Sequence, residues 1–179
     1  KSICTSRSFG ENVTGYPTLS EAVSNFAAAC ARKLREQNSC AGMITVFILT
    51  NRFRTDQPQD FECRTISLPV ATNASGELIA AALTVLKSSY KKGFAYKKAG
   101  CIVSAIVPAN EVQLNLFDET DCVRLQRLYN IVDRVNKKNG MNMLKIAAQG
   151  YSKKWKLKNE HISKRYTTNL ADIITIHCR

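Results

Sequence analysis

Carboxylates and imidazoles are the side chains that could carry catalysis or hold a metal ion, and in this chain they form no known pattern. Asp118, Glu119 and Asp121 stand close together, but no further ligand for a divalent cation lies near them in the sequence. The two histidines, His161 and His177, have no nucleophile beside them in a recognisable motif. The sequence therefore predicts neither a catalytic centre nor a metal site in this chain.

The cysteines also lack a catalytic or metal-binding pattern, because no two of them have Cys-x-x-Cys spacing. They are Cys4, Cys30, Cys40, Cys63, Cys101, Cys122 and Cys178. Most lie in apolar runs, which is typical of buried free thiols in a reducing compartment. No stretch approaches the roughly 18 apolar residues of a membrane helix. We therefore expect a cytoplasmic protein with no membrane contact.

Positive charge is the dominant property of the chain, which has a net charge of +12 and a pI near 9.6. Residues 1–109 carry 13 basic and 7 acidic side chains, and residues 123–179 carry 13 basic and 3 acidic ones. Residues 110–122 between them carry four acidic side chains and no basic one. Two basic blocks joined by an acidic segment predict two modules that face a polyanion.

The acidic segment contains an unusual apolar hexapeptide, Gln113-Leu114-Asn115-Leu116-Phe117-Asp118. Two leucines and a phenylalanine at this spacing have no regular element of their own to bury them, so a partner protein is expected to supply the pocket. A short strand that packs back on its own domain is the alternative. The pattern Gln-Leu-x-Leu-Phe resembles the peptide by which bacterial replication proteins dock on the sliding clamp. The candidate clamp-binding residues are Gln113, Leu114, Leu116 and Phe117.

Strand and helix patterns alternate over the first 109 residues. Strands are expected at residues 1–9, 43–50, 61–68 and 97–107, and helices at about 18–37 and 75–90. The capping box Thr18-x-x-Glu21 marks the start of the first helix, and Pro69 is expected to end the third strand. The chain has no initiator methionine and opens inside a strand pattern, so we expect it to be part of a longer protein.

The order βαββαβ predicts an α+β fold, in which a four-stranded antiparallel sheet carries two helices on a single face. The other face of the sheet would then be open and available to nucleic acid. Basic residues on the strands or just beyond their ends are expected to bind phosphates there. These residues are Arg7, Arg52, Arg54, Arg64, Lys97 and Lys98.

The second basic block, residues 121–179, is expected to form a small α+β domain. Apolar residues at helical spacing run from about 121 to Asn139-Gly140, which is a typical helix end. Short strands are expected at 143–148 and 173–176. Trp155 lies in a run of lysines, and we expect it to be a core anchor rather than a platform for base stacking.

Over nearly its whole length the chain resembles the C-terminal half of the UmuC-type members of the Y-family, the bacterial error-prone polymerases of translesion synthesis and SOS mutagenesis. The motifs that carry the resemblance are Ser6-Arg7-Ser8-Phe9-Gly10, Tyr16-Pro17, Lys33-Leu34-Arg35, Lys98-Ala99-Gly100, the hexapeptide, Ala148-Gln149-Gly150, Trp155 and Arg165-Tyr166-Thr167-Thr168. The resemblance implies three parts. Residues 1–109 are the little finger that grips DNA, residues 110–120 are a linker with the clamp-binding motif, and residues 121–179 are a UmuC-type C-terminal domain.

The resemblance also implies how the parts are used. The sheet lies along primer–template DNA, with Arg7, Ser8, Arg64, Thr65, Lys97 and Lys98 as candidate contacts. The carboxylates that hold magnesium belong to the palm of the longer polymerase, so this part should need no cofactor and have no activity of its own. For residues 121–179 two uses fit, namely extra contacts to DNA or docking of the UmuD′ dimer and the RecA filament, and we favour the docking role. The exposed candidates for that role are Lys153, Lys154, Lys156, Arg165 and Tyr166.

Two other functions fit the same pattern. One is an RNA-recognition-like module, which shares the βαββαβ order but needs stacking aromatics on its first and third strands. The expected first and third strands are poor in such residues. The other is a clamp-tethered adaptor whose basic surface binds protein rather than DNA.

Overall fold

The computed structural model describes residues 1–113, 122–140, 142–151, 154–157 and 163–173. Its strands and α-helices are β1 (Ile3–Val13), α1 (Tyr16–Glu36), β2 (Ser39–Thr50), β3 (Phe61–Thr72), α2 (Ser75–Ser89), β4 (Tyr96–Pro108) and α3 (Cys122–Asn139). Short 3-10 turns follow at Ala109–Glu111, Ala147–Gln149 and Leu170–Asp172. The order confirms the predicted βαββαβ arrangement and the α+β class.

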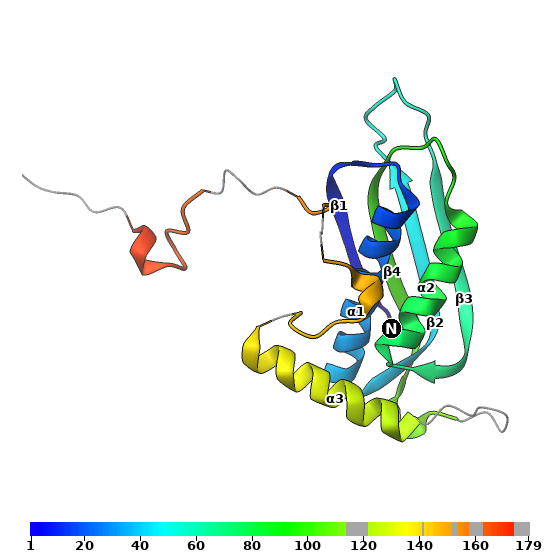
Figure 1. Ribbon diagram of the computed structural model, residues 1–179, viewed down its shortest axis with the longest axis vertical. Helices are drawn as coiled ribbons and strands as arrows, with labels where there is room; N and C mark the ends of the chain where they lie inside the picture. The colour runs from blue at the N-terminus through cyan, green and yellow to red at the C-terminus, as the bar shows by residue number, and fades with distance from the viewer. Residues whose placement is uncertain (114–121, 141, 152–153, 158–162, 174–179) are drawn as a thin grey trace, which may run out of the picture.

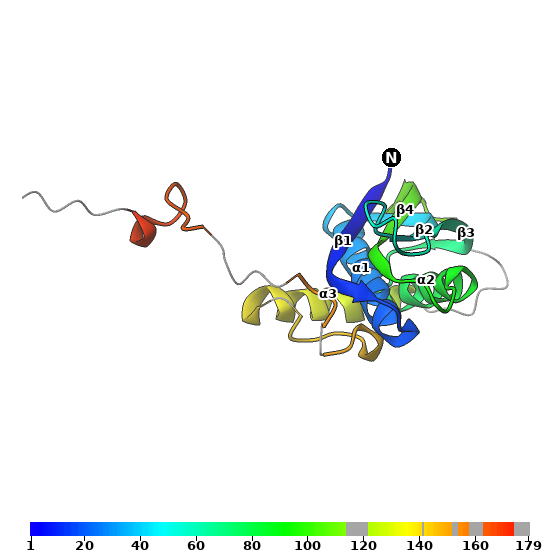
Figure 2. The same ribbon diagram turned by 90° about the horizontal axis from the view of Figure 1, so that it is seen from above.

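The four strands form one sheet in the order β1-β4-β2-β3, and all three pairings are antiparallel. The central strands are therefore β4 and β2, and the edges are β1 and β3. Helices α1 and α2 pack on one face of the sheet, and the opposite face carries no helix of the described chain (Figure 2). This confirms the prediction that both helices of residues 1–109 lie on a single face.

Helix α1 is amphipathic because its apolar residues recur at intervals of three or four. Leu19, Val23, Phe26, Cys30 and Leu34 are all buried against the sheet. The predicted start at a Thr18 capping box is wrong, because the helix begins at Tyr16 after the N-cap residue Gly15. Pro17 lies in the first turn, where the missing backbone N–H has no intrahelical partner to lose.

Strand β3 is longer than predicted, since it runs through Pro69 to Thr72. It is an edge strand, so proline removes no hydrogen bond from a second neighbour. The register between β2 and β3 shifts between Ala41 and Met43, opposite this stretch. Strand β1 likewise continues past Phe9 to Val13. Whether proline ends a strand thus depends on the position of that strand in the sheet, which cannot be read from the local sequence.

The hydrophobic core lies between the sheet and its two helices, and a residue far along the chain completes it. Trp155 is only 4% exposed and belongs to this core. Its ring meets Phe9 and Phe26 edge-on, with ring centroids 6.4 and 5.3 Å away. The prediction that Trp155 is a core anchor is confirmed, although the core that it enters is that of residues 1–109.

The residues between α3 and Trp155 do not form the expected strand. Residues 143–148 are irregular up to the 3-10 turn at Ala147–Gln149, so the strand predicted there is wrong. Of the strand predicted at 173–176, only Ile173 lies in the described part of the chain, in a bend. Among the described helices, none combines the length and apolar character needed to cross a membrane.

Candidate nucleic-acid interface

The surface that the helices leave uncovered consists of rows of paired residues, because paired residues of an antiparallel sheet point to the same side. The three rows nearest to the loop between β2 and β3 are Ser8, Lys98, Leu49 and Phe61; then Ser6, Gly100, Phe47 and Cys63; then Cys4, Ile102, Thr45 and Thr65. We call these twelve residues the open face. The rows between them contain the fully buried Ala99, Cys101 and Val46, which face the helices.

The open face consists mainly of small, hydroxyl-bearing and apolar side chains. Thr45 and Thr65 share a hydrogen bond of 2.7 Å between their hydroxyl groups. The ring of Phe47 lies over Gly100, where an added Cβ would be 2.4 Å from a ring carbon, so glycine is required there. Lys98 is the one charged residue of the twelve. The face can therefore approach another molecule closely, but it brings little charge of its own.

Two predicted phosphate contacts lie on the other side of the sheet. Arg7 pairs with Ala99 and Arg64 pairs with Val46, and both partners are buried under the helices. The expectation that Arg7 and Arg64 belong to the open face is therefore wrong. The sequence could have shown this, because side chains alternate between the two faces along a strand. Arg7 is two residues before the core residue Phe9 and therefore points to the same face.

Three of the other predicted contacts are on the open face, namely Ser8, Thr65 and Lys98. Ser8 and Lys98 are direct neighbours in one row. Lys97 is the extra residue of a bulge, because Leu49 pairs with Lys98 while Thr50 pairs with Tyr96. The Lys97 ammonium group donates to the carbonyl of Gly10 at 3.2 Å. Lys97 is thus held against β1 at the end of the sheet that carries the loop between β2 and β3.

Arg52 and Arg54 lie in the loop that joins β2 to β3, which extends beyond the end of the sheet (Figure 1). Between them is Phe53, which is 94% exposed. Sequence reasoning missed this residue, as it missed Phe61 and Phe47 on the open face. An aromatic ring between two arginines is a pattern that the sequence already contained.

The acidic residues near this loop form ion pairs, so the local net charge comes from the basic residues that are left without a partner. Asp56 accepts two hydrogen bonds from Arg54, at 2.8 and 2.7 Å, and these lower the pKa of the Asp56 carboxyl. Lys91 lies 2.8 Å from carboxylate oxygens of both Asp60 and Glu62. The pKa of Glu62 is lowered, first by its hydrogen bond with Lys91 and then by that with Arg64.

By contrast, the side chains of Arg52 and Lys98 form no hydrogen bond or ion pair with any described residue. Both cations remain available to a ligand, one in the loop and one in the row of the open face nearest to it. The positive charge that the sequence predicted for the face is therefore concentrated at its loop end.

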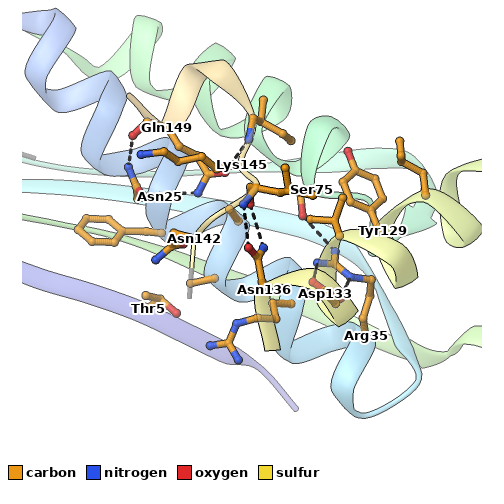
Figure 3. A pocket seen from close by; sticks show the side chains of 18 of the residues that line it. Thr5, Asn25, Arg35, Ser75, Tyr129, Asp133, Asn136, Asn142, Lys145 and Gln149 are labelled. Carbon is orange, nitrogen blue, oxygen red and sulfur yellow. Dashed lines mark hydrogen bonds and ion pairs between the residues drawn. The ribbon is translucent and has the colours of Figure 1, made fainter. Parts of the chain in front are cut away.

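Helix α3 is fixed to the other side of the molecule through one buried arginine (Figure 3). The Arg35 guanidinium donates to both carboxylate oxygens of Asp133, at 2.6 and 2.9 Å. It also donates to the carbonyl of Asn73 at 2.7 Å, and its carbon lies 5.0 Å from the centre of the Tyr129 ring. The Tyr129 hydroxyl in turn accepts a hydrogen bond of 2.8 Å from the backbone of Gly76.

The segment after α3 returns to α1 and β1. The Asn25 side chain donates to the carbonyl of Gln149 at 2.7 Å, and the Trp155 indole donates to the Glu21 carboxylate at 3.1 Å. The backbone N–H of Gly10 donates to the carbonyl of Trp155 at 3.3 Å. A Cβ at Gly10 would be 2.7 Å from the carbonyl oxygen of Lys156, so this approach requires glycine.

A groove of about 500 Å³ lies between α1 and these C-terminal residues (Figure 3). Apolar side chains such as Phe26 and Leu128 line it together with several basic ones. The basic lining residues are Arg7, Arg32, Arg35, Lys145 and Lys156. Such a lining is suited to a ligand that is apolar in one part and acidic in another.

The remaining predicted site residues are only partly described. Lys154, Lys156, Arg165 and Tyr166 are exposed, whereas Lys153 lies outside the described residues. Of the clamp-binding residues, Gln113 is exposed beyond the turn Ala109–Glu111. Leu114, Leu116 and Phe117 lie outside the described residues, as do Asp118, Glu119, Asp121, His161 and His177. Within the part of the chain that is described, no three His, Cys, Asp or Glu side chains could together hold a metal ion.

Comparison with known proteins gives matches over most of the chain. Residues 1–116 match the impB/mucB/samB family C-terminal domain, and residues 126–176 match a domain of unknown function, DUF4113. Among solved structures, the complex of the beta-clamp processivity factor and the little finger domain of PolIV is similar, with a TM-score of 0.46 and 15% identity. That match covers 66% of this chain and 100% of the other chain.

Full-length relatives extend the family match to nearly the whole chain. Protein UmuC of Salmonella typhimurium is 34% identical over 175 residues, which are 97% of this chain and 42% of that protein. Protein SamB of the same organism is 36% identical over 172 residues, 96% of this chain and 40% of that protein. Protein MucB of Escherichia coli is 34% identical over 172 residues, with the same two coverages. The chain thus spans about two fifths of the length of these relatives, and it belongs to the impB/mucB/samB family, whose C-terminal domain it contains.

Proposed function

We propose that this chain is the C-terminal, non-catalytic part of an error-prone translesion DNA polymerase of DNA repair and SOS mutagenesis. In this proposal residues 1–109 grip primer–template DNA, residues 110–120 dock on the sliding clamp, and residues 121–179 bind protein partners. The observation that carries it, within a chain of this family, is the sheet whose helices all pack on one face. The uncovered face and its cationic loop end form the DNA-binding surface.

The composition of the open face favours a particular kind of grip. Hydroxyl groups and backbone N–H groups are regular partners of DNA phosphates and need no charge to bind them. Ser6, Ser8 and Thr65 supply the hydroxyls on the two edge strands. Lys98 and Arg52 add phosphate contacts at the loop end. Such binding reads the shape of the duplex backbone and has little sequence preference.

Two alanine substitutions of basic residues, one on each face of the sheet, test this mode of DNA binding. Lys98→Ala removes the cation of the open face, and it should make the log–log dependence of DNA affinity on salt shallower by about 0.9. Arg64→Ala is the matched control, because Arg64 projects from the helix side and is paired with Glu62. Its slope should stay close to that of the parent chain. Equal effects of the two variants, or binding that ignores salt, would contradict the proposed orientation.

Docking on the sliding clamp is proposed for Gln113, Leu114, Leu116 and Phe117. The support is the apolar pattern of the hexapeptide within an acidic segment. Truncating Leu116 and Phe117 together to alanine should abolish measurable binding, since anchor residues of this kind contribute roughly 2 kcal/mol each. Calorimetry with purified clamp gives the readout, and Leu170→Ala serves as a control for an exposed leucine outside the motif.

Catalysis is proposed to belong to the longer polymerase, whose palm would hold the magnesium ions. The purified chain should therefore add no nucleotide to a primed template in the presence of magnesium. Primer extension that copurifies with this chain through repeated steps would overturn that part of the proposal.

For residues 121–179 we propose the docking of the UmuD′ dimer or the RecA filament. The basic and apolar groove between α1 and the C-terminal segment supports this role. Charge reversal at Arg7 and Lys156 should weaken binding of the UmuD′ dimer while DNA affinity at low salt stays within a few-fold. A large loss of DNA affinity in this variant would instead assign the groove to DNA.

An RNA-recognition-like module is the less favoured function. Its first and third strands must present aromatic rings that stack bases together. In this sheet β1 and β3 are the opposite edges, and the aromatic residue of β1, Phe9, is buried in the core. The adaptor alternative predicts no salt-dependent DNA binding, so the same titrations decide it.

A further inference from the structure

The loop between β2 and β3 presents an aromatic ring to solvent. Phe53 is 94% exposed, the highest exposure of any large apolar side chain in the described residues. Singly exposed apolar residues are common on proteins and need no explanation. Phe53 differs from them in its setting, because its loop is ordered and its neighbours are cations.

Hydrogen bonds hold the loop in a defined shape on both sides of Phe53. The backbone N–H of Phe53 donates to the Asn51 side chain at 3.2 Å, and that of Arg54 donates to the Asn51 carbonyl at 3.1 Å. The Gln59 amide donates to the Arg54 carbonyl at 2.6 Å and accepts from the Thr50 hydroxyl at 2.9 Å. The ring is therefore presented by a braced turn, and little ordering entropy is lost when a ligand covers it.

The charges around the ring are positive and partly unpaired. Arg52 precedes it without an ion-pair partner among the described residues, while the nearby acid Asp56 is neutralised by Arg54. At the base of the loop, Lys98 shares a row with Phe61, an aromatic side chain that is 59% exposed. Aromatic rings interleaved with cations are the composition of surfaces that bind nucleic-acid strands.

We propose that Phe53 stacks on an unpaired base of the bound DNA while Arg52 binds a neighbouring phosphate. This inference rests on the proposed DNA-binding function and adds to it a site at the loop tip, away from the strands. A flat ring beside an unpaired arginine matches the face of a base and a neighbouring phosphate. A duplex would have to be unstacked before it could offer the same base face, so single-stranded template is the favoured ligand.

The test uses the whole chain and three fluorescein-labelled DNAs: a single strand, a blunt duplex, and a primer–template with a 5′ overhang. Anisotropy titrations compare the parent with Phe53→Ala, Phe53→Leu and Phe53→Trp. The alanine and leucine variants should lose about tenfold in affinity for the single strand and the primer–template, and tryptophan should restore it. Affinity for the blunt duplex should stay near that of the parent. Tyr151→Ala is the control, because Tyr151 is an 82% exposed aromatic residue in the segment after α3.

Salt titrations separate the two residues of the site. Phe53→Ala should leave the log–log salt slope unchanged, because the ring carries no charge. Arg52→Ala should make the slope for single-stranded DNA shallower by about 0.7.

The possible results distinguish this inference from the function on which it rests. If the parent binds DNA and Phe53→Ala binds all three probes equally well, the stacking site is refuted and the DNA grip stands. If Phe53→Leu binds the single strand as tightly as the parent, simple apolar burial explains the contact and stacking is refuted. If Phe53→Ala loses as much affinity for the blunt duplex as for the single strand, the ligand is not an unpaired base. If the parent binds none of the probes, the proposed DNA-binding function itself fails.

Discussion

At the scale of single residues, Trp155 joins the C-terminal segment to the core of the sheet. It is 4% exposed, lies against Phe9 and Phe26, and donates to Glu21. Trp155→Ala should lower the free energy of unfolding by about 3–5 kcal/mol, because it leaves a large cavity. Trp155→Phe should cost less, since it keeps an aromatic ring and leaves a smaller cavity, although it also loses the indole donor to Glu21. Urea titrations followed by far-UV circular dichroism measure both, and Tyr151→Ala should have almost no effect.

An equally small loss of unfolding free energy in Trp155→Ala would mean that the core closes without the indole.

The cysteines make a second prediction at this scale, because burial raises the pKa of the thiols of Cys30 and Cys101. Iodoacetamide at pH 8 should alkylate the exposed Cys4 and Cys63 and spare the other two until urea is added. Peptide mass mapping gives the readout. Alkylation of Cys101 as fast as that of Cys63 would contradict the buried position.

The same burial sets the sign of the pH dependence. A thiol with a raised pKa in the folded state contributes stability that is fully present below its unfolded value, about 9.0. That contribution is lost as the pH rises through the folded value. The free energy of unfolding should therefore fall above about pH 9 in the parent, and it should fall less steeply in Cys101→Ala. Identical alkaline slopes in the two proteins would exclude Cys101 as a source.

At the scale of the elements, the docking of α3 depends on an ion pair that is largely removed from water. The side chain of Arg35 is 7% exposed and that of Asp133 is 27% exposed. Asp133→Asn would leave the Arg35 guanidinium buried without its anion, and it should cost about 3 kcal/mol of folding free energy, the lower end for a buried pair because Asp133 is partly exposed. Arg35→Lys should not rescue the fit, because lysine cannot make the two parallel hydrogen bonds.

A surface pair of the same geometry is the matched control for that prediction. Arg54 and Asp56 also form two hydrogen bonds, but their side chains are 52% and 58% exposed. Asp56→Asn should therefore leave the urea midpoint nearly unchanged. Equal shifts for Asp133→Asn and Asp56→Asn would show that burial of the α3 pair contributes nothing.

Part of the arrangement of the elements could be predicted from the sequence. The order of strands and helices was predictable, because each carries its own apolar period. The faces of Arg7 and Arg64 were predictable too, because each lies two residues from an apolar residue of the helix side, Phe9 in β1 and Ile66 in β3. A count of basic residues along the strands ignores this alternation and so placed both on the wrong face. The extension of β3 through Pro69 was not predictable, since it depends on that strand's place at the edge of the sheet. Nor could a local pattern show that Trp155 packs against Phe9 and Phe26, which lie more than a hundred positions earlier in the chain.

At the scale of the whole molecule, the two basic blocks of the sequence are physically continuous. The open face lies on one side of the sheet, and α3 and the described residues that follow it up to Lys156 pack on the helix side (Figure 2). Since the C-terminal segment completes the core, the stability of the proposed DNA grip and that of the partner-binding groove are coupled. Ligands on one side would stabilise the residues that build the other.

This coupling predicts a single cooperative unfolding transition, and the one tryptophan of the chain is placed to detect it. Fluorescence excited at 295 nm reports on Trp155, which belongs to the C-terminal segment, whereas circular dichroism at 222 nm reports on all three helices, α1 and α2 in the first block and α3 in the second. Because Trp155 lies between Phe9 and Phe26, it cannot leave without opening the core of the sheet. The two urea curves should therefore superimpose, with the same midpoint and slope. Asp133→Asn should move both curves together to lower urea. A fluorescence transition that precedes the circular dichroism transition would instead mean that the C-terminal segment detaches first, and that the two blocks fold as separate units.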